Sequence, residues 1–190
     1  MRRVLVAGVC LFASGLVLAH VTPNVQLVNR GEFTKSSLAS AVSFSERRLQ
    51  IDAPDLAAIR KATHWTPSEE DVKMYAGRDA QGNLVGTAAF VWMPSEHGPV
   101  GIGVAFDRSG RILKAEVTDV GTEPLVWVRP LLHSGGMTAF QGLPPDQAAD
   151  PGRIAPDVTG RMNRYYAEVI ARGVFRAQAL ERISLEAVGK

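Results

Sequence analysis

Apolar and polar residues alternate along four consecutive segments in the middle of the chain. The predicted strands cover residues 72–76, 84–92, 100–106 and 112–119. Turn-forming residues at 79–83 and 107–111 join them in pairs. A period of two is typical of half-buried antiparallel strands, and short glycine-containing turns connect such strands into hairpins. The pattern therefore predicts two β-hairpins.

Two other segments have helical spacing. Asp52 followed by Pro54 is typical of a helix start, because an acidic side chain caps free N–H groups and proline fits the first turn. Later in the chain, apolar residues from Met162 to Leu180 fall on one face of a long helix. From Leu180 to Val188, alternation predicts a final strand. Hairpins followed by a packed helix indicate an α+β fold, an antiparallel sheet of two or more hairpins covered by helices.

The chain opens with the features of an export signal. Arg2 and Arg3 precede an apolar run that ends near Ala19, where small residues match the site that a signal peptidase reads. Residues 1–19 are therefore predicted to be a signal peptide, with an uncleaved N-terminal membrane anchor through residues 4–19 as the alternative. Both imply an exported or periplasmic protein, and the second alternative anchors it to the inner membrane.

The rest of the chain divides into two parts. Residues 20–50 are rich in serine, threonine and asparagine with scattered apolar positions, and we predict an extended leader there. Residues 51–190 are predicted to form one domain, which is long enough to bury a sizeable core.

Composition narrows the possible functions. Cys10 lies in the apolar run, so the mature chain would have no cysteine, and disulfides, thiolate nucleophiles and iron–sulfur sites are excluded. Of the 21 lysine and arginine residues, 19 remain without Arg2 and Arg3, and they balance the 19 acidic residues. A chain with a net charge near zero is not expected to have a nucleic-acid surface. The four histidines lack metal-ligand spacing. No triad or paired carboxylates are visible, so we predict neither catalytic residues nor a metal site.

Several short motifs follow one another in an order known from one protein family. They are Gly98-Pro99-Val100, Gly110-Arg111-Ile112, Thr122-Glu123-Pro124, Phe140-Gln141-Gly142 and Asp157-Val158-Thr159-Gly160. In this order they resemble the FMN-binding domain family, which includes the small flavin-bearing subunits of sodium-pumping NADH:quinone oxidoreductases and of Rnf-type complexes. The resemblance implies an FMN-binding-domain-like fold, electron transfer in the periplasm, and a membrane or periplasmic redox partner.

One position departs from the family in its chemistry. The family carries FMN on a threonine or serine four residues after the signature glycine, and Arg164 stands at that distance from Gly160. Since arginine cannot form this ester, the resemblance implies a non-covalent FMN site. Together with the chemistry of the residues themselves, it leads us to predict six cofactor-binding residues, Thr159, Gly160, Arg161, Arg164, Glu123 and Trp127.

The residues have a physical interpretation apart from the family. Thr159 is predicted to cap the long helix, whose free N–H groups would favour an anion. Arg161 and Arg164 would add two guanidinium groups that suit a phosphate. Alternatively, both arginines are solvated, or paired with Asp157 and Glu168, at an ordinary helix start. Trp127 is the one tryptophan kept as a flavin contact, although buried tryptophans usually belong to the core.

Two hypotheses of function follow. In the first, the protein is a redox carrier or a subunit of an oxidoreductase complex, and the bound FMN supplies the redox chemistry. In the second, the protein has lost the flavin and serves as an interaction or adapter module for a membrane redox complex, because a fold alone does not fix a function.

Overall fold

The computed structural model describes residues 23–69, 71–150, 152 and 159–188. The predicted signal peptide or anchor at 1–19 lies outside these residues. Among the helices of the described part, none is both long and apolar enough to cross a membrane.

A six-stranded antiparallel sheet forms the centre of the molecule, with the order β1-β6-β5-β4-β3-β2. Its strands are β1 (Asn24–Gln26), β2 (Ser43–Arg48), β3 (Lys73–Arg78), β4 (Leu84–Met93), β5 (Val100–Asp107) and β6 (Ile112–Gly121). The four central strands are the two predicted hairpins, and β4 and β5 pair antiparallel to join them into one sheet. The prediction of a mixed fold built on an antiparallel sheet is confirmed.

The helices are α1 (Arg30–Ser37), α2 (Ala53–Thr63), α3 (Leu125–His133), the short 3-10 helix η1 (Gly136–Phe140) and α5 (Arg161–Val188). Capping side chains explain where two of these helices begin. The Asp52 carboxylate accepts a hydrogen bond from Asp55 N–H at 2.9 Å, which confirms the predicted cap of α2. The Asn29 side chain accepts from Gly31 and Glu32 N–H at the start of α1.

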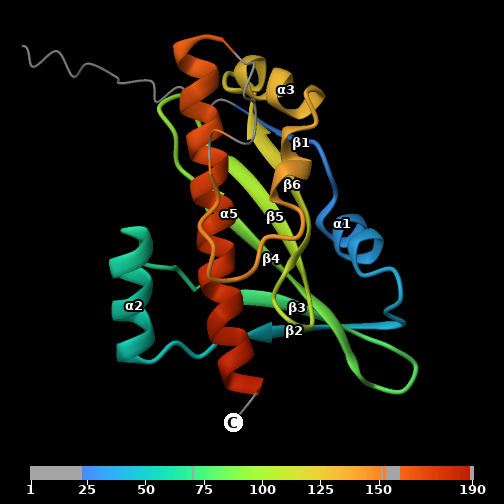
Figure 1. The fold of residues 1–190 in the computed structure, drawn as a ribbon. Coiled ribbons are helices and arrows are strands. Elements are labelled where there is room, and N and C mark those ends of the chain that lie inside the picture. The colour runs from blue at the N-terminus through green and yellow to red at the C-terminus, as the bar shows by residue number, and fades with distance from the viewer. Residues whose placement is uncertain (1–22, 70, 151, 153–158, 189–190) are drawn as a thin grey trace, which may run out of the picture.

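Helices pack on both faces of the sheet. Successive side chains of β4 point to opposite faces of the sheet. Ala89, Val91 and Met93 face α5, which lies across the sheet in Figure 1. The intervening residues Ala88 and Phe90 pack with Phe33 of α1 in a second, smaller cluster on the opposite face. Burial on both faces explains why β4 and β5 contain so few polar residues.

The prediction of an extended leader at 20–50 is wrong for the part that is described. This segment forms β1, α1 and β2, and its two strands are the edges of the sheet, paired with β6 and β3. Because β2 is an edge strand whose residues are almost all exposed, it lacks the alternation that identifies a half-buried strand. The domain therefore includes Asn24 and the residues after it.

The predicted final strand at 180–188 is also wrong, because α5 continues through Val188. Leu180, Ile183 and Ser184 are all buried, and their spacing of three and four residues is that of a helix face.

Candidate functional site

The helix start that the sequence assigned to FMN is exposed. Thr159, Gly160, Arg161 and Arg164 all face solvent. Gly160 has a φ of 109°, and its carbonyl accepts the hydrogen bond from Arg164 N–H at 3.2 Å. Gly160 rather than Thr159 therefore occupies the cap position, one residue before α5 begins. Asp157, the suggested partner of the arginines, lies outside the described residues.

The two arginines have no side-chain partner among the described residues. Glu168, their other suggested partner, is exposed and makes no ion pair with them there. The positive end of a 28-residue helix and two uncompensated guanidinium groups thus lie within one turn of each other. This arrangement suits an anion such as a phosphate.

Glu123 and Trp127 lie far from α5 in the sequence. In the fold they lie close to the first turns of this helix. The ring of Trp127 in α3 stacks on Tyr166 of α5, with centroids 5.7 Å apart and planes at 8°. His97 contacts Trp127 at 4.9 Å between centroids, and its Nδ1 lies 2.8 Å from Oε1 of Glu123. We call His97, Glu123, Trp127, Tyr165 and Tyr166 the aromatic cluster.

Hydrogen bonds fix both tyrosines of this cluster to the loop between β4 and β5. The Tyr166 hydroxyl lies 3.1 Å from Ser95 Oγ, and the Tyr165 hydroxyl accepts from Glu96 N–H at 3.1 Å. Burial raises the pKa of Tyr166; the Ser95 hydrogen bond lowers it, and Tyr165, Glu123 and Glu96 add to the rise. Tyr166 therefore stays protonated at neutral pH, as a structural group.

The geometry fits the phosphate end of FMN better than its ring. Tyr166 stacks on one face of the Trp127 ring, and the His97 ring lies against the same indole at a tilt of 44°, so an isoalloxazine ring would compete with these side chains for Trp127. Trp127 in this arrangement positions Tyr166 and His97 near the helix start. It is not an open stacking platform.

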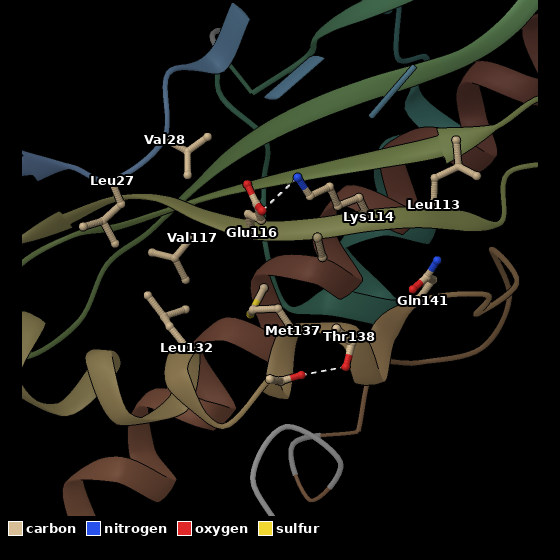
Figure 2. A pocket seen from close by; sticks show the side chains of 12 residues that line it. Leu27, Val28, Leu113, Lys114, Glu116, Val117, Leu132, Met137, Thr138 and Gln141 are labelled. Carbon is tan, nitrogen blue, oxygen red and sulfur yellow. Dashed lines mark hydrogen bonds and ion pairs between the residues drawn. The ribbon is translucent and has the colours of Figure 1, made fainter. Parts of the chain in front are cut away.

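A cavity that the sequence did not predict lies along the outer edge of β6 (Figure 2). It has a volume of about 470 Å³, and none of the six predicted site residues lines it. Leu27 and Val28 border it on one side, and Leu132 and Met137 on another. Lys114 and Glu116 of β6 form an ion pair of 2.9 Å at its wall. Its volume lies in the range of small-molecule sites.

The edge of β6 is only partly covered beside this cavity. β1 pairs with residues 119–121, and Leu27 and Val28 both donate to the carbonyl of Thr118. At the other end, Ile112 exchanges hydrogen bonds with the chain at 142–143. No strand among the described residues pairs with the stretch 113–117 on this side. Such an edge can accept an added strand.

No group of three or more histidine, cysteine, aspartate or glutamate side chains in the described part could hold a metal ion. Comparisons with protein-family models, with curated proteins and with solved structures gave no match.

Proposed function

We propose that this protein is an exported, periplasmic electron-transfer protein that binds FMN non-covalently at the amino end of α5. The observation that carries the proposal is that Arg161 and Arg164, which have no side-chain partner in the described part, lie in the first turn of α5 beside its free N–H groups. The antiparallel sheet with a long helix across it supports the same assignment, since an FMN-binding-domain-like fold has these parts.

The roles of the residues follow from their chemistry. The N–H groups from Gly160 onward and the two guanidinium groups would hold the phosphate, and each charge-assisted contact is worth about 1.5–3 kcal/mol. Glu123 and His97 would form a polar boundary beside the site. FMN supplies the one- and two-electron redox chemistry, so the protein needs no catalytic side chain and works with a membrane or periplasmic redox partner.

FMN titration tests the proposal through the quenching of flavin fluorescence. Arg161→Ala combined with Arg164→Ala should weaken FMN binding by at least about tenfold and leave riboflavin, which lacks the phosphate, nearly unchanged. Arg172→Ala is the matched control, because Arg172 is an exposed arginine three turns into the same helix. Flavin should also be absent from the protein band on a denaturing gel.

If the double variant weakened the binding of FMN and of riboflavin equally, or changed neither, the phosphate site would be contradicted. A flavin that survives denaturation would contradict the non-covalent linkage.

A second function is favoured by the cavity beside β6. A flavin-free adapter would need a surface for its partner, and residues 113–117 offer an open strand edge next to apolar side chains. An extended segment of a membrane redox complex could add to this edge as a further strand. If the purified protein binds no FMN even at excess, this adapter function becomes the better proposal.

A further inference from the structure

A second cavity lies on the other side of the sheet from α1, between α5 and strands β2 to β4. Its volume is about 340 Å³. Apolar side chains, including Met74, Leu84 and Leu185, form part of its wall. The cavity is remote from the amino end of α5, because its helical lining comes from residues 181–185.

Glu181 of α5 places a carboxylate in this wall. Its side chain is fully buried, with an exposed fraction of 0%. Oε2 accepts a hydrogen bond from Thr87 Oγ1 of β4 at 2.6 Å. Oε1 is also buried and has no hydrogen-bond partner among the described residues. Buried carboxylate oxygens nearly always accept a hydrogen bond, because leaving one unpaired costs free energy. Among the described residues, Oε1 of Glu181 is an exception, and a donor is missing there.

Arg47 of β2 lines the same cavity with the opposite charge. It is half buried and forms no ion pair or hydrogen bond with any residue in the described part. Its charge nevertheless acts on the Glu181 carboxyl from a distance. One wall of the cavity thus presents an acceptor without a donor, and another presents a cation without an anion.

The other charged groups of the cavity are already engaged. Arg78 donates to the carbonyl of Gly82 at 2.8 Å, and Glu46 accepts from the Tyr75 hydroxyl at 3.3 Å. A metal ion is a poor occupant, because the described part of the chain holds no cluster of three metal-binding side chains. The missing partners are therefore an N–H donor for Glu181 and an anion for Arg47.

We propose that this cavity binds a small zwitterion of the amino-acid class. Its ammonium group donates to Oε1 of Glu181, and its carboxylate pairs with Arg47. The apolar wall receives the carbon chain between the two groups, and the volume is within the range of sites for small ligands. This site is independent of FMN binding.

The test is calorimetric titration of the full mature protein with two isomeric zwitterions, L-norvaline and 5-aminopentanoate. They share composition but differ in the distance between ammonium and carboxylate. Pentylamine and pentanoate serve as half-ligands. At least one zwitterion should bind about tenfold or more tightly than either half-ligand, because it makes both charge-assisted contacts.

Two variants assign the contacts. Glu181→Gln keeps the shape of the side chain and the acceptor for Thr87, and Arg47→Ala removes the cation. Each variant should weaken binding of the zwitterion by about tenfold or more. Arg47→Lys should restore part of the loss. Arg48→Ala is the control, since Arg48 is exposed on the same strand and pairs with Glu69 at 3.3 Å. It should leave binding unchanged, and melting curves verify that each variant folds.

Two results would overturn the proposal. One is that neither zwitterion binds the unaltered protein at millimolar concentration. The other is that Glu181→Gln binds as tightly as the unaltered protein while remaining folded, since Glu181 would then take no part in binding.

Discussion

Burial raises the pKa of the Glu181 carboxyl from 4.5 to about 7. The hydrogen bond from Thr87 lowers it, the charge of Asp107 at the end of β5 raises it, and Arg47 of β2 lowers it. Desolvation dominates because the group is enclosed by α5 and the sheet. In the absence of a ligand, this carboxyl therefore takes up a proton near neutral pH.

This protonation makes the stability of the protein depend on pH. The folded state binds the Glu181 proton more tightly than the unfolded state does, so its contribution to stability is complete below about pH 4.5 and is lost as the pH rises to about 7. The loss amounts to about 3 kcal/mol for this shift. Urea unfolding of the unaltered protein and of Glu181→Gln across this range measures it.

The difference between the two proteins isolates Glu181, because every other carboxylate is common to both. The advantage of Glu181→Gln should grow from pH 4.5 to pH 7. A constant difference across that range would show that Glu181 ionises normally.

The buried position of Glu181 was not predicted from the sequence. The predicted helix face ran from Met162 to Leu180, and Glu181 lies on the same face, four residues after Ala177. A glutamate on an apolar face was a signal of a buried polar site, but the alternation after Leu180 was interpreted as a strand. Trp127 was predicted as a flavin contact, whereas its stacking on Tyr166 depends on a long-range contact that no local pattern contains.

At the scale of elements, α5 packs closely against the sheet at Gly173. A Cβ atom there would lie 2.2 Å from Cδ1 of Ile102 and 2.9 Å from Cγ of Met93. Both neighbours are buried in the main core, so they have little room to move. The glycine is therefore used for close packing, although it weakens the helix itself.

Gly173→Ala should for this reason destabilise the protein. Alanine favours the helix by about 1 kcal/mol, whereas overpacking of a core costs about 1–3 kcal/mol. Ile102→Val removes the Cδ1 atom and should relieve much of the clash when it is combined with Gly173→Ala. A double-mutant cycle by urea unfolding measures this coupling. A stabilised Gly173→Ala protein would mean that helix propensity outweighs the contact.

The four central strands were predicted from the sequence, whereas the two edge strands and α1 were not. Strands β3 to β6 were predicted because each has a regular pattern or lies in a hairpin with clear turn residues. The edge strands β1 and β2 were missed, since β1 has three residues and β2 is mostly exposed. The cap of α1 by Asn29 was present in the sequence, but the helix has few apolar residues to support it.

At the scale of the whole molecule, the two faces of the sheet are covered by segments from opposite ends of the chain. α5 packs on one face, and α1 packs on the other through Phe33. The amino-terminal segment also supplies both edge strands. Its removal would uncover the small cluster and both edges together, so the domain is expected to fold only with residues 24–48 present.

Phe33→Ala tests this dependence without shortening the chain. Phe33 is fully buried at 0% exposure, and its ring meets Phe90 edge-on at 5.6 Å between centroids. Replacing it should cost about 3–5 kcal/mol, as for other buried phenylalanines, because a cavity forms on the α1 face. Val42→Ala is the control from the same segment: Val42 is 68% exposed, and its replacement should change stability by less than about 0.5 kcal/mol. Urea unfolding compares the two. If both variants proved equally harmless, α1 would not be part of the cooperative unit, and the segment would behave as the loosely attached leader that the sequence first suggested.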